Sequence, residues 1–126
     1  IELIKKNYKK KIILIDRFID STIAYQHYGM GINIKLINII NQFLLKQIKV
    51  NFTFLNLVNK KNMLLRLIKR KNLNRYDKFK TNFYTRVQNG FIRIQKKSPK
   101  KYMKINSNLD INLNKKLIIS KINELI

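Results

Sequence analysis

The sequence predicts an α/β fold with a mostly parallel sheet flanked by helices. Short apolar runs typical of buried strands alternate with amphipathic patterns typical of helices from one end of the chain to the other. Parallel neighbours in a sheet need crossover helices, which this alternation supplies. With 126 residues, one proline and 45% hydrophobic residues, the chain fits one compact unit, and we predict a single domain over residues 1–126.

Three segments are predicted as strands. Residues 12–15 form an unbroken apolar run after three lysines, and residues 52–58 form a second run rich in aromatic and β-branched side chains. Residues 102–105 are a shorter third candidate. In open parallel sheets, ligands bind beyond the carboxyl ends of the strands. Chemistry is therefore expected first in the residues directly after Ile15.

Four segments have the apolar spacing of amphipathic helices. They cover residues 34–48, 63–68, 79–94 and 117–125. Asn33 is placed to cap the amino end of the first helix, because its side-chain oxygen can accept from the exposed backbone N–H groups. Ser98 and Pro99 are expected to end the third helix, since proline cannot continue it.

The chain is strongly basic, with 28 Lys and Arg against 6 Asp and Glu and a formal net charge of +22. Charge alone favours a nucleic-acid-binding protein. Isoleucine, lysine and asparagine nevertheless dominate every stretch of the sequence, which indicates a global compositional drift with lysine as the default surface residue. Composition alone leaves both interpretations open.

Several kinds of chemistry are excluded by composition. The chain has no cysteine and one histidine, His27, so a disulfide framework, a thiolate nucleophile and a structural zinc site are ruled out. Any metal would need oxygen ligands. No apolar run approaches the ~20 residues that span a bilayer, and the first residues lack the features of a secretory signal. We therefore expect a soluble protein without a membrane partner.

The residues after Ile15 read Asp-Arg-Phe-Ile-Asp-Ser-Thr-Ile-Ala-Tyr-Gln, an unusual density of polar groups for this chain. Arg17 stands out because lysine is used almost everywhere else, and a guanidinium can grip a phosphate with two parallel hydrogen bonds. Taken one at a time, these residues indicate only a helix start, with Asp20 or Ser21 as the cap and Arg17 as a surface cation.

In combination, residues 16–26 resemble the signature Asp-Arg-aromatic-x-x-Ser-Ser/Thr-x-Ala-Tyr-Gln of bacterial-type thymidylate kinases, and residues 28–32 continue it. Further similar motifs follow in the family's order at residues 53–55, 64–70, 73–77, 83–91 and 105–107. The resemblance implies a P-loop nucleoside monophosphate kinase-like fold. It also implies transfer of the γ-phosphate of ATP to thymidine monophosphate (dTMP), with Mg²⁺, to give dTDP in dTTP biosynthesis.

The resemblance assigns roles to individual side chains. The implied dTMP site comprises Arg17, Ser21, Thr22, Tyr25 and Gln26. Arg17 would bind the phosphate, Thr22 and Gln26 would hydrogen-bond the thymine edge, and Tyr25 would pack against the sugar. Asp16 would lie near the magnesium and the phosphates, contacting the metal indirectly.

The implied ATP site comprises Arg66, Arg70, Arg75, Asn106 and Ser107. Arg66 would stack on adenine, whereas Arg70 and Arg75 would reach the transferring phosphates from a lid near residues 69–77. The implied catalytic set is Asp16, Arg17, Arg70 and Arg75. Such a parts list suits phosphoryl transfer, which needs positioning and charge neutralisation more than a covalent nucleophile.

The phosphate-binding loop of such kinases is missing from the sequence. It requires Gly-x-x-x-x-Gly-Lys-Ser/Thr, and the only glycines are Gly29, Gly31 and Gly90. We therefore expect a C-terminal portion of the enzyme, missing its N-terminal strands, poorly stable alone and inactive without the N-terminal segment as partner. The resemblance further implies a homodimer in a bacterial or endosymbiont cytoplasm, or in an organelle stroma or matrix.

Two other functions remain open from the sequence. The alternative is a basic nucleic-acid-binding protein of ribosomal type, whose RNA affinity would fall steeply with salt. The third is a decaying remnant without activity. The partners that the resemblance implies are dTMP and ATP, and they do not include a nucleic acid.

Overall fold

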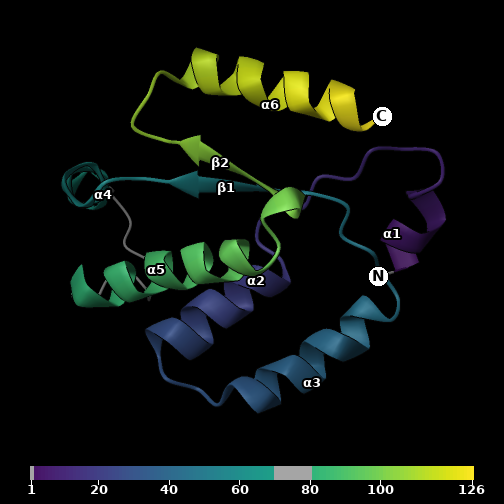
Figure 1. The fold of residues 1–126 in the computed structure, drawn as a ribbon, viewed down its shortest axis with the longest axis horizontal. Coiled ribbons are helices and arrows are strands. Elements are labelled where there is room, and N and C mark those ends of the chain that lie inside the picture. The colour runs from purple at the N-terminus through teal and green to yellow at the C-terminus, as the bar shows by residue number, and fades with distance from the viewer. Residues whose placement is uncertain (1, 70–80) are drawn as a thin grey trace.

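The computed structural model describes residues 2–69 and 81–126 and places two strands between layers of helices (Figure 1). The strands are β1 (Thr53–Leu57) and β2 (Tyr102–Asn106). The helices, including the π-helix η1 and the 3₁₀-helix η2, are α1 (Glu2–Asn7), α2 (Ile19–Thr22), η1 (Ile23–Gly29), α3 (Ile34–Leu45), α4 (Lys60–Ile68), α5 (Thr81–Lys97), η2 (Pro99–Lys101) and α6 (Ile111–Leu125). In Figure 1, α6 lies on one side of the strands, and α5, α2 and α3 lie on the other.

The two strands run parallel, pairing Thr53 with Tyr102 at one end and Leu57 with Asn106 at the other. Their connection passes through α4 and α5, as a parallel pair requires. The predicted strands at residues 52–58 and 102–105 are thus confirmed, with ends shifted by one residue. The predicted α/β class with a parallel sheet and flanking helices is confirmed as well.

The predicted strand at residues 12–15 is wrong, because this segment is assigned neither strand nor helix. Ile12, Leu14 and Ile15 are 59%, 75% and 44% exposed. A strand needs a hydrogen-bonded neighbour, and in the described part of the chain the sheet contains only β1 and β2. The apolar run therefore has the composition of a buried strand without a partner that would bury it.

The helix predictions hold in type and differ at the ends. The Asn33 cap is confirmed, since its side-chain oxygen accepts from the backbone N–H of Lys35 at 2.9 Å. The third predicted helix ends as expected before Ser98, although its first residues lie outside the described part of the chain. The closing helix begins earlier than predicted, because Asp110 caps it with hydrogen bonds to two backbone N–H groups. No described helix combines the length and apolar character needed to cross a membrane.

The core lies where α5 packs against η1. Ala24, Phe83 and Val87 are its buried centre, and half-buried aromatic and aliphatic side chains surround them. The two helices approach closely because each contributes a glycine. A Cβ added at Gly29 would meet the Phe83 ring at 2.6 Å, and one added at Gly90 would meet the Tyr28 ring at 2.6 Å. The π-helix η1, which contains the end of the polar segment, is thereby held tightly against α5.

Candidate active site

Asp16 and Arg17 follow the extended segment directly, and both are exposed. The backbone of Arg17 has a φ of 61°, in the left-handed region. A non-glycine residue held there costs about 1–3 kcal/mol, and such residues cluster at functional sites. The Arg17 guanidinium lies over the ring of Tyr25, with 5.1 Å from the guanidinium carbon to the ring centroid. The arginine predicted to bind phosphate is therefore held beside the next helix and open to solvent.

That helix begins without a side-chain cap. Phe18 occupies the cap position of α2 and makes no side-chain cap hydrogen bond. The Ser21 backbone N–H donates to the Phe18 carbonyl at 3.0 Å. The Asp20 carboxylate accepts a hydrogen bond from the Tyr102 hydroxyl and caps no backbone N–H. The interpretation of Asp20 or Ser21 as a cap is therefore wrong.

From Ile23 to Gly29 the chain continues as the π-helix η1. At its end the Met30 N–H donates to the Tyr25 carbonyl at 3.0 Å, the wide spacing of a π-turn. Such turns are rare in proteins, and those that occur are often found at functional sites. Tyr25 packs edge-on against Phe83 and Phe91, with ring centroids 6.0 and 6.3 Å apart. The aromatic face of Tyr25 is thus fixed by the core.

Gln26 carries a buried amide oxygen. Its Oε1 is out of contact with solvent and has no hydrogen-bond partner in the described part of the chain. A buried acceptor without a donor is costly, and Asn41, Gln95 and Asn114 each carry a buried amide atom in the same condition. Ser21 and Thr22 are half-buried on the same segment. All five residues of the predicted dTMP site therefore lie in one short segment, and two of them, Arg17 and Tyr25, are in contact.

The predicted ATP residues are brought together in part. The Arg66 Nη2 donates to the Ser107 carbonyl at 2.6 Å, which joins α4 to the loop after β2. Asn106, the last residue of β2, directly precedes this loop. Arg70, Arg75 and the predicted lid beyond Lys69 lie outside the described residues.

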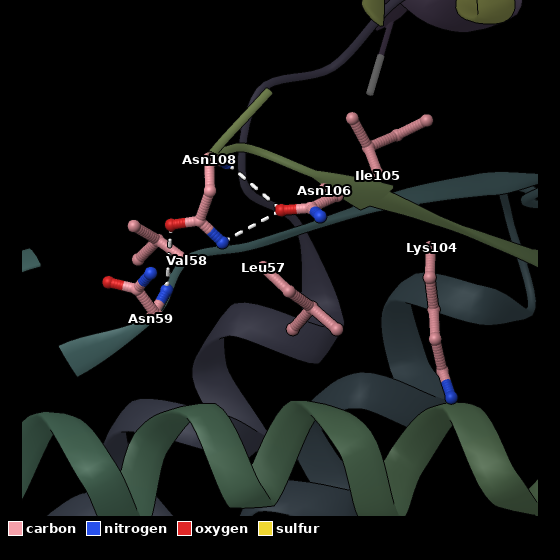
Figure 2. Close-up of a pocket in the computed structure, with 7 residues that line it drawn as sticks. All are labelled: Leu57, Val58, Asn59, Lys104, Ile105, Asn106 and Asn108. Carbon is pink, nitrogen blue, oxygen red and sulfur yellow. Dashed lines mark hydrogen bonds between the residues drawn. The ribbon is translucent and has the colours of Figure 1, made fainter. Parts of the chain in front are cut away.

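A cavity of about 300 Å³ opens at the carboxyl ends of the two strands (Figure 2). It is lined by Leu57, Val58, Asn59, Lys104, Ile105, Asn106 and Asn108. The side-chain oxygen of Asn108 accepts from the Asn59 backbone N–H at 3.1 Å, and its amide nitrogen donates to Asn106 Oδ1 at 2.7 Å. Of these three asparagines the sequence predicts only Asn106 for the ATP site, because no local motif distinguishes Asn59 and Asn108 in an asparagine-rich chain.

Asp20 forms a contact that the sequence did not predict. The Tyr102 hydroxyl donates to Asp20 Oδ2 at 2.8 Å, which joins α2 to the first residue of β2. Burial raises the pKa of the Asp20 carboxyl above its usual range, and the hydrogen bond from Tyr102 opposes part of that rise. Burial and the neighbouring carboxyl also raise the pKa of the Tyr102 hydroxyl. Both residues are half-buried.

The raised pKa of Asp20 predicts how stability depends on pH. The protonated Asp20 carboxyl contributes to the free energy of unfolding. This contribution is fully present below the unfolded pKa of 3.8 and is lost as pH rises through the higher pKa of the folded state. Asp20→Asn removes the charge and keeps an acceptor oxygen. We expect this variant to melt above the wild type at pH 7 in circular dichroism, and the difference to vanish near pH 3. Glu2→Gln at an exposed site is the control. A lower melting temperature for Asp20→Asn at pH 7 would contradict the burial effect.

Mg²⁺ would have to bind through acidic side chains of this chain. No three His, Cys, Asp or Glu side chains gather closely enough in the described part of the chain to hold a metal by themselves. Mg²⁺ usually keeps several waters and binds through one or two carboxylates together with substrate phosphates. The exposed carboxylate of Asp16, next to Arg17, fits a site of that kind.

Parallel strands covered by helices, with an arginine and a polar helix start just past an apolar segment, define part of a nucleoside monophosphate kinase-like fold. A family model described as thymidylate kinase matches residues 1–118. The chain belongs to the thymidylate kinase family.

Individual relatives agree with this assignment. A thymidylate kinase of Ehrlichia chaffeensis is 43% identical over 91 residues, which cover 72% of this chain and 43% of the relative. One of Ehrlichia canis is 42% identical over 103 residues, covering 82% of this chain and 48% of the relative. One of Wolbachia pipientis is 36% identical over 89 residues, covering 71% and 43%. The chain therefore spans about half the length of the curated relatives it matches.

A solved structure supports the same fold. The crystal structure of thymidylate kinase from Ehrlichia chaffeensis matches with a TM-score of 0.64 and 30% sequence identity. The match covers 97% of this chain and 59% of the solved chain. The fold is thus a partial version of that kinase fold, as predicted.

Proposed function

We propose that this chain is the dTMP-binding part of a thymidylate kinase that transfers the γ-phosphate of ATP to dTMP to give dTDP. One observation carries the proposal. The Arg17 guanidinium lies over the Tyr25 ring, one residue before the buried and unpartnered amide oxygen of Gln26. A phosphate-binding cation, an aromatic face and an unsatisfied acceptor on one segment suit a pyrimidine nucleotide, and membership of the family supports the same ligand.

Each side chain has a role in this proposal. Arg17 binds the dTMP phosphate through its guanidinium, which remains exposed. Gln26 accepts from the thymine N–H, with Thr22 beside it, and Tyr25 packs against the sugar. Asp16 holds Mg²⁺ indirectly, and that ion, when bound with ATP, neutralises charge on the phosphates.

In this proposal the nucleoside of ATP binds at the carboxyl ends of β1 and β2. There Arg66 is bonded to the loop of Ser107, beside the cavity that Asn106 lines. A guanidinium held by such a bond has a planar face on which adenine can stack. Arg70 and Arg75 are proposed to act on the phosphates, and their placement lies outside the described residues.

The proposed activity needs a phosphate cradle that these 126 residues lack, since they contain no Gly-x-x-x-x-Gly-Lys-Ser/Thr. The apolar run at residues 12–15 is exposed, and β1 pairs only with β2 in the described part of the chain. An unpaired sheet edge, such as that of β1, can pair with a further strand. We therefore propose an N-terminal kinase segment as the partner; the homodimer and the cytoplasmic location also remain predictions.

A coupled assay of dTDP formation tests the proposal. With ATP and Mg²⁺ the chain alone should give no turnover, and adding a separate N-terminal segment that carries the glycine-rich loop should restore it. The same segment with its loop lysine changed to alanine is the control. The complemented protein should accept dTMP and reject uridine monophosphate. Turnover by the chain alone would refute the dependence on the segment, and absence of dTMP binding with the segment present would refute the function.

A further inference from the structure

The segment proposed to bind dTMP is fastened to the rest of the protein near both ends. At its carboxyl end, the Arg86 guanidinium donates to the Gly29 carbonyl from Nη2 at 2.8 Å and from Nε at 3.3 Å. In the middle, Tyr25 packs against the α5 aromatics. Both attachments lead to α5. At the amino end, the Asp20 carboxylate leads instead to the sheet, through Tyr102.

We propose that Tyr102 is a positioning residue for the dTMP site, holding Asp20 so that α2 and η1 begin at a fixed place relative to the sheet. This inference rests on the proposed function. The bond spans 82 residues of sequence and is half-buried, so solvent competes with it only in part. Its acceptor stands two residues before Thr22 and six before Gln26.

The start of this helix has need of such an anchor. α2 continues directly into η1 but has no side-chain cap at its amino end, so its first backbone N–H groups lack a side-chain acceptor. Three residues before Asp20, the backbone of Arg17 is held in a left-handed conformation that is unfavourable in isolation. A conformation of this kind persists only where the surroundings impose it. The Tyr102 bond supplies a constraint from the sheet at this point.

The Asp20–Tyr102 hydrogen bond engages Asp20 without involving Arg17. No ion pair joins Arg17 to Asp16 or Asp20 in the part of the chain that the structure describes. A carboxylate bound to Arg17 would compete with a nucleotide phosphate for the same donors. In the described part of the chain Asp20 accepts from a neutral hydroxyl, and the guanidinium lies on the Tyr25 ring, an arrangement that suits binding of a phosphate by Arg17. Among the described residues Asp20 is the half-buried acid, and its hydrogen-bond partner is Tyr102.

Amide hydrogen exchange of the free chain, read by mass spectrometry, tests the inference. Tyr102→Phe should raise exchange about fivefold to tenfold in residues 19–29, as expected for one lost half-buried hydrogen bond. Exchange in α6 should stay unchanged. Tyr8→Phe, at an exposed tyrosine, is the matched control and should change neither region. Faster exchange everywhere, or no change in residues 19–29, would overturn the inference.

Asp20 variants separate positioning from simple loss of packing. Asp20→Asn keeps an acceptor for the Tyr102 hydroxyl and should retain most of the protection, whereas Asp20→Ala removes the acceptor and should raise exchange in residues 19–29, as Tyr102→Phe does. The double variant Tyr102→Phe/Asp20→Ala should be no worse than either single variant, because both remove the same bond. Additive effects would overturn the inference.

A dTMP titration distinguishes this inference from the proposed function. Tyr102→Phe should weaken dTMP binding severalfold. The Tyr8→Phe control should bind dTMP with wild-type affinity. Equal affinity in Tyr102→Phe and the wild type would overturn positioning of the site. A wild-type chain that does not bind dTMP, even with the N-terminal segment, would refute the proposed function, while the exchange measurements still decide whether Tyr102 holds the helix.

Discussion

Phe83→Ala is expected to abolish cooperative folding of this chain. Phe83 is 3% exposed, lies at the centre of the core with Ala24 and Val87, and supports the ring of Tyr25. Truncating a buried phenylalanine to alanine typically costs about 3–5 kcal/mol. A domain of this size is stabilised by only about 5–15 kcal/mol. Because Ile12, Leu14 and Ile15 add little buried area to this core, we expect the stability of this chain near the lower end of that range.

Thermal unfolding followed by circular dichroism measures the effect. The wild type should show a cooperative transition, and Phe83→Ala should show none or one displaced downward by about 10 °C or more, since each kcal/mol shifts the midpoint of a domain of this size by about 4 °C. Tyr8→Ala removes an aromatic ring that is 59% exposed and should shift the midpoint little. Similar shifts for the two variants would show that α5 and η1 do not form the main core.

The parts of the fold that the sequence predicts correctly are those decided by local pattern. Residues 52–58 and 102–105 became strands because each is apolar and each has the other as a neighbour. Residues 12–15 have an equally apolar composition and did not, because strand formation depends on a partner that lies elsewhere in space. Asn33 was recognisable as a cap, since capping acts over only two or three residues.

The candidate site divides in the same way. Arg17, Tyr25 and Gln26 were predicted from one contiguous motif, and the structure places them on one segment. The Asp20 contact with Tyr102 joins residues 82 positions apart, and neither has a local signal for it. Such contacts arise from the packing of a helix on a sheet, which a single sequence does not specify at the level of atoms. The roles of the segment in binding therefore stay predictions that mutation must test.

Arg17→Ala is expected to weaken dTMP binding about 10- to 100-fold, because charge-assisted hydrogen bonds contribute about 1.5–3 kcal/mol and each 1.4 kcal/mol is a factor of ten. The dTMP affinity of Arg17→Lys should fall between those of the wild type and Arg17→Ala, since an ammonium keeps the charge and loses the bidentate geometry. Isothermal titration of the complemented protein with dTMP measures both variants. Thymidine, which lacks the phosphate, should bind the wild type and both variants with equal affinity. An equal loss for thymidine would show that Arg17 shapes the pocket and does not bind the phosphate.

Arg17→Gly separates binding from folding more sharply. Glycine adopts the φ of 61° without the Cβ penalty, which is about 1–2 kcal/mol for other residues. The variant should therefore melt at or above the wild-type temperature, even though the contact with the Tyr25 ring is lost. Its dTMP affinity should nevertheless fall as far as that of Arg17→Ala. A more stable protein that no longer holds the phosphate would mean that the chain keeps a strained backbone in order to present this guanidinium. Retained affinity in Arg17→Gly would remove Arg17 from the site.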